Sequence, residues 1–397
     1  MDGRRLYDVA VIGGGPAGST VALFLAKQGV NVAVLEKCSV PRYKTCGGGV
    51  VQRAMRLLPA GAREAVEREC CAAELHLSDS DLHFSVSRPR PILFMTMRDR
   101  LDNSLLSSAA DAGANVYTGC QLIDLRHENG VVELQTNRGS LSAHFAVAAD
   151  GTTSLTARKA GWTERLNVMP ALESEIWVDD ATLEKFSRGA RFDLGVIGHG
   201  YAWVFPKRDH LSIGLLCTRR GSADLRGILE HYLKLLSVKR IDRVEHHGYV
   251  IPSSPRKGPL VLGRVILVGD AAGLVDPMTA EGITYAVWSG QLAARAIIDG
   301  DFSEDRVKHI YETAVEETIL PELRYGRLLA RVIYGASWIR TSFFGLYGDR
   351  LIEALTNVFI GEKTYGGYMR DPANYLKLLT FSFGKNFRKS VGTGIIA

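Results

Sequence analysis

The sequence predicts an α/β fold, in which a discontinuous Rossmann-like nucleotide-binding domain is joined to an antiparallel-sheet domain and a helical C-terminal region. Three observations predict this class. A strand, a glycine-rich turn, a helix and a second strand occupy residues 7–36; strand-rich segments follow; and a second strand, turn and helix appear at 261–298. A strand that returns to the first sheet so late in the chain implies a discontinuous domain.

The glycine-rich turn follows an apolar strand over 7–12 and precedes a helix expected from 19 to about 27. In this context G-x-G-x-x-G needs its first glycine for the tight turn, its second for close approach to a pyrophosphate and its third for helix packing. The free N–H groups of the helix N-terminus suit an anion. A glycine-rich loop without a ligand is the alternative. The residues predicted to bind phosphate are Gly13, Gly15, Pro16, Ala17 and Gly18.

The second strand, over 30–35, ends in the carboxylate of Glu36. A carboxylate at this place can accept hydrogen bonds from both ribose hydroxyls of an adenosine. It would repel a 2′-phosphate, so the predicted nucleotide is FAD or NAD rather than NADP.

A basic loop leaves this strand on the edge where the pyrophosphate is expected. Pro41 and three successive glycines rule out regular structure. We expect Arg42 and Lys44 to contact phosphate or substrate, the glycines to let backbone lie against a flat ring, and Cys46 to lie near that ring. A flexible linker with an incidental cysteine is the alternative. The residues predicted to contact the cofactor here are Lys37, Arg42, Lys44, Cys46, Gly47 and Gly48.

The next segments are strand-rich, which is not the layout of a dehydrogenase. Short helices are expected over 50–58 and 62–71, strands of a second sheet over 73–78, 83–87 and 92–97, and a helix over 99–112. Strands over 115–118, 122–126, 131–136 and 141–149 follow, with hairpin turns at Asn129-Gly130 and Arg138-Gly139. The last strand ends at Asp150-Gly151, where Asp150 is either a ligand-edge residue or a turn residue.

An antiparallel pattern covers about 161–250, with strands over 173–178, 191–197, 200–206, 212–217 and 246–251 and a helix over 225–236. The period of two places Tyr201, Trp203 and Phe205 on one face of their strand. Such a face is either plain sheet core or the cover of a flat cofactor ring.

A second buried strand, over 261–268, runs into Gly269-Asp270 and, after Gly282-Ile283, a long helix. Asp270 at the strand end can accept hydrogen bonds from sugar or ribityl hydroxyls. The helix after Gly282 offers N–H groups and a dipole to a delocalised anion.

Composition excludes several classes of function. The net charge of +5 on 397 residues, with no basic stripe, gives no reason to expect nucleic acid. Six cysteines without metal-type spacing predict no metal site and a reduced, cytoplasmic protein. We expect no signal peptide and no membrane span. The C-terminal residues 303–397 are expected to be helical, and the stretch from Pro372 is either a solvated tail or a peripheral membrane contact, because it carries Lys377, Lys385, Arg388 and Lys389 and no acid.

The ordered motifs resemble the FAD-dependent oxidoreductases of the para-hydroxybenzoate hydroxylase class and, within it, the geranylgeranyl reductase family. The resemblance covers Tyr7 to about Ile298, and two segments discriminate this family: Lys44-x-Cys46-Gly-Gly-Gly49 and Tyr201-x-Trp203-x-Phe205-Pro206. The second FAD motif usually contains Pro-x-x-Gly-Glu-Gly, and here Ala280 replaces the first of those two glycines.

The resemblance implies FAD as the cofactor and adds contacts to those predicted above. Arg98 belongs to an Arg-x-x-aromatic-Asp element, with Leu101 in the aromatic position and Asp102 at its end, and would reach the FAD. The implied domains are an FAD-binding domain (1–75, 98–165 and 258–300), an antiparallel-sheet substrate domain (76–97 and 166–257) and a helical region (301–397). The further implied cofactor contacts are Arg98, Asp150, Gly269, Asp270, Gly282 and Ile283.

The implied reaction is saturation of carbon–carbon double bonds in a polyprenyl lipid by hydride transfer from reduced FAD. An isolated alkene accepts hydride poorly, so a proton donor must assist, and Cys46 is the catalytic candidate. A substrate channel would be lined by Tyr201, Trp203, Phe205 and Pro206, whose aromatic faces stabilise developing positive charge. NAD(P)H, bound transiently, or reduced ferredoxin would supply the electrons.

Three other functions stay open. A flavin-dependent halogenase shares a lysine in the loop and an aromatic strand, but this chain has Cys46-Gly-Gly after the lysine and Tyr201 where a halogenase has tryptophan. An aromatic or quinone monooxygenase has the same fold with oxygen chemistry, and a flavin-binding electron carrier would turn over no lipid. The polyprenyl acceptor is also open among ether lipids, geranylgeranyl diphosphate, a chlorophyll side chain and menaquinone tails.

Overall fold

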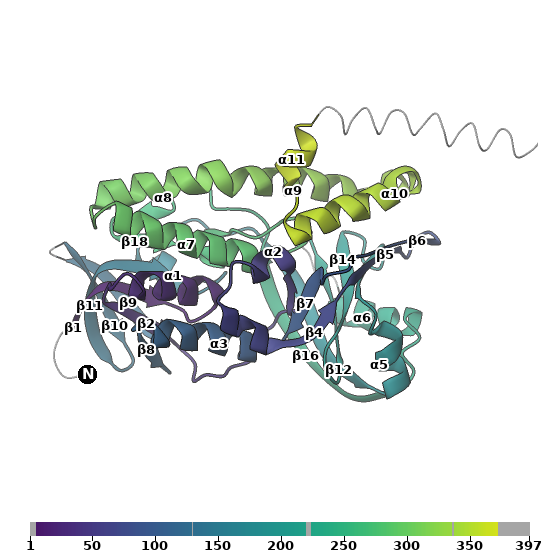
Figure 1. Cartoon of the computed structure of the whole chain (residues 1–397), viewed down its shortest axis with the longest axis horizontal. Helices are drawn as coiled ribbons and strands as arrows, with labels where there is room; N and C mark the ends of the chain where they lie inside the picture. Colours follow the sequence, from purple (N-terminus) through teal and green to yellow (C-terminus); the bar gives the residue numbers. More distant parts are fainter. Residues whose placement is uncertain (1–4, 129, 220–223, 336, 372–397) are drawn as a thin grey trace, which may run out of the picture.

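The computed structural model describes residues 5–128, 130–219, 224–335 and 337–371 (Figure 1). An eight-stranded sheet forms the first part of the fold. Its strands are β1 (Arg5–Ile12), β2 (Val32–Glu36), β8 (Asn115–Thr118), β9 (Leu122–Glu128), β10 (Val131–Thr136), β11 (Gly139–Ala148), β17 (Val261–Leu262) and β18 (Val265–Leu267). The β1 strand lies between β2 and β11 in parallel pairings, β2 pairs with β8, and β11 pairs with β18. Because β18 joins the sheet so late in the chain, the predicted discontinuous Rossmann-like architecture is confirmed.

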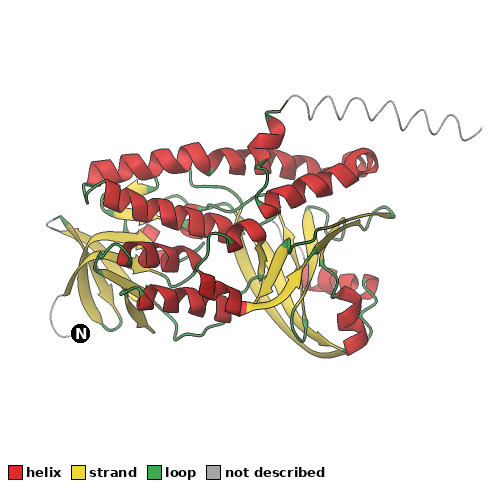
Figure 2. Ribbon diagram, in the orientation of Figure 1, coloured by secondary structure: helices red, strands yellow, loops and turns green. Residues whose placement is uncertain are grey.

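Helices cover this sheet, and they are α1 (Pro16–Ala26), α3 (Arg98–Asp111), α7 (Ile283–Asp299) and α8 (Glu304–Thr318) (Figure 2). The central strands are apolar and buried on both faces, as parallel strands between helical layers require. The α1 helix packs against α3 and α7. Gly290 allows the close approach of α7, because a Cβ atom there would lie 2.8 Å from the carbonyl oxygen of Ala17.

The second sheet has seven strands in the order β16 (Ile241–Pro252), β12 (Val168–Val178), β15 (Leu211–Cys217), β14 (Gly200–Pro206), β13 (Ala190–Leu194), β5 (Ala72–Leu77) and β6 (Leu82–Ser87). All neighbours are antiparallel except β13 and β5, which are parallel. One face packs with Leu229 and Tyr232 of α6 (Leu225–Leu235) and with Phe186 of α5 (Asp180–Phe186). The opposite face carries the three aromatic residues of β14 and belongs to a different hydrophobic cluster.

A three-stranded sheet of β3 (Gly49–Val51), β7 (Leu93–Thr96) and β4 (Val66–Cys70) links the two larger sheets. It corrects three predictions. The segment 62–71 is not a helix, because after a 3₁₀ turn (Ala60–Ala65) it pairs with β7 as a strand. The segment 92–97 belongs to this small sheet and not to the seven-stranded one. A helix over 50–58 is reduced to α2 (Gln52–Met55), since Val50 and Val51 pair with β7.

Three more helices, α9 (Leu320–Ile333), α10 (Ser337–Ile360) and α11 (Tyr365–Met369), continue from α8. The α10 helix packs on β5, β6 and α2, so the C-terminal layer extends from the first sheet to the second (Figure 1). No helix within the described residues is long and apolar enough to cross a membrane. The basic stretch from Pro372 lies outside the described residues.

Candidate active site

The glycine-rich turn connects β1 to α1, and steric contacts explain two of its glycines. Gly13 has φ +109°, and a Cβ atom on it would lie 2.4 Å from the carbonyl oxygen of Ala149. A Cβ on Gly18 would lie 1.9 Å from the carbonyl oxygen of Gly13. At Gly15, by contrast, a Cβ would make only ordinary van der Waals contacts, with Arg98 Nη2 at 3.8 Å and Asp102 Oδ2 at 4.0 Å, so no steric clash requires glycine there.

The start of α1 fits a pyrophosphate. The α1 helix begins at Pro16 with Gly15 as N-cap, and no side chain caps it. Its first-turn N–H groups therefore lack the usual side-chain partner and are available to an anion. Both Gly15 and Pro16 line the large cavity described below.

Glu36, at the end of β2, is buried and tied to the loop that follows. Its Oε2 accepts hydrogen bonds from the backbone N–H of Gly14 (2.9 Å) and from Arg42 Nη2 (3.3 Å), and its Oε1 accepts one from the N–H of Cys38 (3.0 Å). Burial opposes ionisation, but Arg42 and the two N–H groups hold the pKa of Glu36 below its usual range. An ionised carboxylate has room for further donors, as a ribose contact requires.

Arg42 makes an ion-pair network where a phosphate or substrate contact was expected. Its Nη1 lies 3.0 Å from Asp102 Oδ2, and Asp102 also accepts from Arg98 Nε (2.7 Å) and Nη2 (2.8 Å). Arg98 and Asp102 are one turn apart on α3, so the Arg-x-x-x-Asp spacing puts both side chains on one helix face. The network leaves Arg98 pointing into the cavity beside Cys46.

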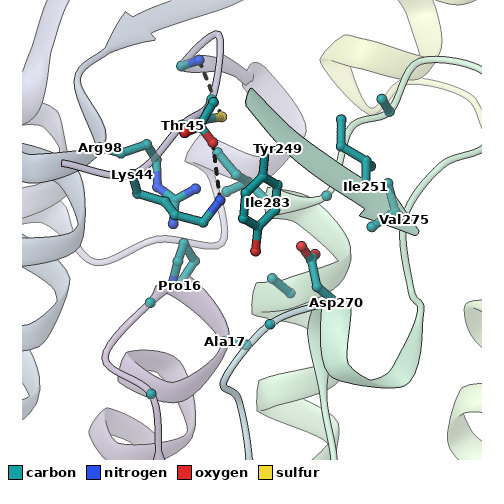
Figure 3. Close-up of a pocket in the computed structure, with 18 of the residues that line it drawn as sticks. Pro16, Ala17, Lys44, Thr45, Arg98, Tyr249, Ile251, Asp270, Val275 and Ile283 are labelled. Carbon is teal, nitrogen blue, oxygen red and sulfur yellow. Dashed lines mark hydrogen bonds between the residues drawn. The ribbon is translucent and has the colours of Figure 1, made fainter. Parts of the chain in front are cut away.

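Lys44 lies deeper in the same loop. Its Nζ is 3.3 Å from the centre of the Tyr249 ring and donates to the carbonyl oxygen of Thr45 at 3.1 Å (Figure 3). Burial and the neighbouring Arg98 guanidinium lower the pKa of Lys44 to about 8. Tyr249, on β16, has no counterpart in the predicted site.

The glycines after Cys46 are held against the aromatic strand. A Cβ on Gly47 would lie 2.9 Å from Trp203 Nε1, and one on Gly48, which has φ +67°, would lie 2.0 Å from the carbonyl oxygen of Thr96. The fully buried Lys207 donates to the carbonyl oxygens of Gly47 (2.7 Å) and Thr96 (2.8 Å). The sequence analysis did not predict a role for Lys207; the only indication was its position directly after the buried strand.

The second glycine-rich segment brings Asp270 toward Lys44 and Tyr249 (Figure 3). Gly269 starts a 3₁₀ turn (Gly269–Ala272) with φ +53°. Burial raises the pKa of Asp270, against the opposing effects of Lys44 and Arg98. The α7 helix then begins at Ile283 after Gly282, and the Glu281 carboxylate accepts a hydrogen bond from the first-turn N–H of Thr284 at 2.7 Å. Gly282, Ile283 and Asp270 line the cavity, whereas Gly269 is buried beneath it.

Asp150 also lies at the cavity, but its carboxylate serves the next helix, α4 (Leu155–Lys159). Oδ1 accepts from Ser154 Oγ at 2.5 Å, and Oδ2 accepts from the backbone N–H and hydroxyl of Thr156 at 3.0 and 2.9 Å. These three bonds hold its side chain at the start of α4, as in the turn-residue alternative, and Asp150 also lines the cavity.

All these elements surround one cavity of about 530 Å³. Tyr201, Trp203 and Phe205 line it together, as their spacing predicts, whereas Pro206 does not. Phe192, Tyr201, Thr279 and Phe359 also line a smaller, apolar cavity of about 60 Å³ that reaches Ile352 and Leu355 of α10. The cavity is therefore charged at the end near α1 and aromatic or aliphatic at the end near α10. Within the described part of the chain, no three His, Cys, Asp or Glu side chains gather as metal ligands would.

The family comparison agrees with this geometry. The model of the FAD binding domain family matches residues 6–205, half of the chain. With its uncapped helix N-terminus, its buried acid and its cavity of about 530 Å³, the protein is an FAD-binding oxidoreductase.

Individual relatives narrow the class. Digeranylgeranylglycerophospholipid reductase 2 of Methanothermobacter thermautotrophicus is 32% identical over 323 residues, covering 75% of this chain and 81% of that one. Geranylgeranyl diphosphate reductase of Oryza sativa chloroplasts is 27% identical over 420 aligned positions, covering 97% and 87%. The chain belongs to the geranylgeranyl reductase family of FAD-dependent oxidoreductases.

Solved structures show the same fold. A geranylgeranyl bacteriochlorophyll reductase-like protein from Thermoplasma acidophilum superposes with a TM-score of 0.75 at 24% identity, covering 95% of this chain and 96% of that one. A flavin-dependent brominase has a TM-score of 0.72 at 18% identity, covering 97% and 100%. Fold alone therefore does not separate reductases from halogenases.

Proposed function

We propose that this protein saturates carbon–carbon double bonds of a polyprenyl lipid. The observation that carries the proposal is the cavity that changes from a charged end at Gly15 and Arg98 to an apolar end at Phe359. A nucleotide suits the charged end, and a hydrocarbon chain suits the apolar end. FAD, when bound, supplies hydride to the alkene.

The residues of this chain have distinct proposed roles. The uncapped N-terminus of α1 binds the pyrophosphate, and Glu36 binds the ribose. The loop around Gly47 and Gly48, fixed by Lys207, lies against the flat ring, and the N–H groups at the start of α7 favour negative charge on it. Trp203, Phe205 and Tyr201 exclude water and present π faces to positive charge that develops on the alkene.

Cys46 is the proton donor that the sequence nominates. Its Sγ accepts a hydrogen bond from the N–H of Gly48 at 3.3 Å, and Arg98 lies beside it. A Cys46→Ala variant that binds FAD and reduces alkenes at the wild-type rate would remove Cys46 from the reaction.

Halogenase or monooxygenase activity is the alternative, and the shared fold with a brominase is the observation that favours it. Both alternatives consume oxygen, whereas alkene saturation does not. Anaerobic turnover of the FAD-loaded protein, with dithionite as electron source, therefore tests the choice. Product formed only in air would refute the proposed function. Comparing NADPH, NADH and reduced ferredoxin in the same assay identifies the donor.

A membrane surface is the proposed source of the lipid. Exposed apolar side chains gather where α9 ends and α10 begins, next to the exposed Arg324 and Arg331; they are Leu328, Val332, Trp338, Ile339 and Leu346. An aromatic and aliphatic face bordered by arginine is typical of helices that lie at an anionic lipid interface. Trp338→Ala should reduce co-sedimentation with anionic vesicles. Leu235→Ala, which removes an exposed leucine of α6, is the control and should bind like wild type. Equal binding of the two variants would contradict a membrane contact at Trp338.

A further inference from the structure

Two buried carboxyl groups on β12 have no role in the function described so far. Glu173 and Glu175 are each 1% exposed, in a strand that is otherwise mostly apolar. The hydroxyl of Tyr43 lies 2.6 Å from Glu173 Oε2 and 3.4 Å from Glu175 Oε1. Ser212 Oγ donates to Glu173 Oε1 at 2.9 Å. The Tyr43 oxygen thus lies within hydrogen-bond distance of both acids.

A hydrogen-bonded chain continues from Glu175 to solvent. His210 Nε2 lies 2.8 Å from Glu175 Oε2, and His210 Nδ1 lies 2.7 Å from Asp209 Oδ1. The His210 side chain is 5% exposed and that of Asp209 is 70% exposed. At the other end, Glu173 and Tyr43 line the large cavity. The chain therefore joins the cavity to the surface through groups that all exchange protons.

Strand register places Glu173 beside the aromatic wall. Glu173 pairs with Gly214 of β15, and Gly214 pairs with Trp203 of β14. A Cβ on Gly214 would lie 2.2 Å from Trp203 Cζ2, so the indole ring lies over the glycine between the two strands. Its Nε1 is 3.4 Å from Ser212 Oγ, which also bonds to Glu173. The carboxyl group is thus next to the ring proposed to face the alkene.

The protonation states favour a proton on Glu173. Burial and the charge of Glu175 raise the pKa of Glu173. Burial acts in the same direction on Glu175, but His210 and Lys207 hold the pKa of Glu175 below its usual range. Burial lowers the pKa of His210, and its bonds to Glu175 and Asp209 outweigh that effect and raise it.

Further charged or titratable groups surround the two acids. Lys207 follows β14, and Lys44 follows Tyr43 in the loop. On β16, His247 is paired with Glu173 and Glu245 with Glu175, and the His247 ring is tilted by 32° against Tyr43 at 4.1 Å between ring centres. The Tyr43 hydroxyl bonds directly to both carboxyl groups, with none of these groups in between. The Cys46 thiol has no such source of protons, because the Arg98 guanidinium beside it stays protonated at every accessible pH and passes no proton on.

We propose that Glu173, rather than Cys46, donates the proton for alkene reduction and that Tyr43, Glu175 and His210 resupply it from solvent, an inference that rests on the proposed function. The O–H bond of Glu173 breaks and a C–H bond forms at one alkene carbon. Hydride from reduced flavin forms the C–H bond at the other carbon, so the flavin is oxidised as the alkene is reduced. The Glu173 carboxylate then takes the proton of the Tyr43 hydroxyl while His210 passes its own proton through the Glu175 carboxylate to Tyr43, and His210 regains a proton from solvent beside the exposed Asp209.

The test uses the FAD-loaded protein and three variants. Glu173→Gln removes the proposed donor, Tyr43→Phe removes only the relay hydroxyl and keeps the ring on His247, and Glu316→Gln alters an exposed carboxylate on α8, away from β12, as the control. Infrared spectra of the oxidised proteins without substrate should show a protonated-carboxyl band at neutral pH. We expect this band in wild type and Glu316→Gln and its loss in Glu173→Gln.

Anaerobic rates supply the second readout. Removal of a general acid costs about 10²–10⁴-fold, so Glu173→Gln should lose that much alkene reduction while its flavin is still reduced by dithionite. Tyr43→Phe should slow turnover with the infrared band intact. An unchanged band or an unchanged rate in Glu173→Gln would overturn the inference and leave the proposed function standing. A wild-type protein that reduces no polyprenyl chain would instead refute the proposed function, and this inference with it.

Discussion

Gly214→Ala tests the wall of the proposed channel. The new Cβ would lie 2.2 Å from Trp203 Cζ2 and 2.6 Å from the carbonyl oxygen of Leu172. Carbon atoms pack at about 3.5–4.0 Å, so the indole would have to move by roughly 1.3–1.8 Å. The Leu172 carbonyl belongs to β12, which is paired along its length with β15, and it cannot retreat without loss of that pairing.

The cost follows from these contacts. Overpacking costs about 1–3 kcal/mol. Displacing the indole also removes the hydrogen bond from Trp203 to Ser212, worth about 0.5–1.5 kcal/mol. We therefore expect Gly214→Ala to lower the free energy of unfolding by about 2–4 kcal/mol, measured by urea unfolding. FAD absorbance of the purified variant should be retained, because Gly214 lies outside the nucleotide site, and alkene reduction should fall.

Gly248→Ala is the matched control. Gly248 lies on β16 of the same sheet, and a Cβ there would have no heavy atom within 4 Å. Its stability should be unchanged or higher by up to about 1 kcal/mol, since alanine loses less entropy than glycine in a strand. If Gly214→Ala unfolds within about 0.5 kcal/mol of wild type and keeps full activity, the assigned contact of Trp203 with Gly214 is wrong.

Three further predictions concern the FAD turn, the second motif and the buried acid. Gly18→Ala should give colourless protein, because its Cβ would lie 1.9 Å from the Gly13 carbonyl oxygen; normal FAD content would contradict this. Ala280 has φ +54°, a left-handed conformation that costs a non-glycine residue about 1–2 kcal/mol. Glycine relieves this strain but costs about 0.4–1 kcal/mol through the entropy of the unfolded chain, so Ala280→Gly should leave the free energy of unfolding in urea unchanged or raise it by about 1 kcal/mol. A decrease of more than about 1 kcal/mol would show that Ala280 is not strained. The raised pKa of Glu173 means that the folded protein binds a proton above about pH 4.3 that the unfolded chain releases. Stability should therefore fall as the pH rises from there through the folded-state pKa, and a Glu173→Gln protein with the same pH dependence of unfolding would disprove the shift.

Local steric rules made the nucleotide end predictable. The contacts that require glycine at Gly13 and Gly18 lie within one turn and its neighbouring strand, so the spacing of the glycines predicts them. The alternation of Tyr201, Trp203 and Phe205 likewise predicts their common face, because side chains alternate along a strand. Pro206 continues the same motif but falls at the strand end, beyond the cavity.

The features that the sequence did not predict depend on contacts between residues far apart in the chain. The residues around 66–70 have good helix formers, yet they form a strand because β7, far along the chain, pairs with them. The link between Tyr43 and Glu173 crosses 130 positions and depends on how the loop lies against β12. Only Glu173-x-Glu175, two acids on one face of a mostly apolar strand, carried a signal for this cluster.

The most direct measurement is mass spectrometry of a polyprenyl lipid after anaerobic incubation with the FAD-loaded protein and dithionite. Alkene saturation predicts a gain of two hydrogen atoms for each double bond reduced, and loss of that gain when the protein is omitted. An unchanged lipid mass without oxygen, together with an oxygenated or halogenated product in air, would contradict the proposed reduction.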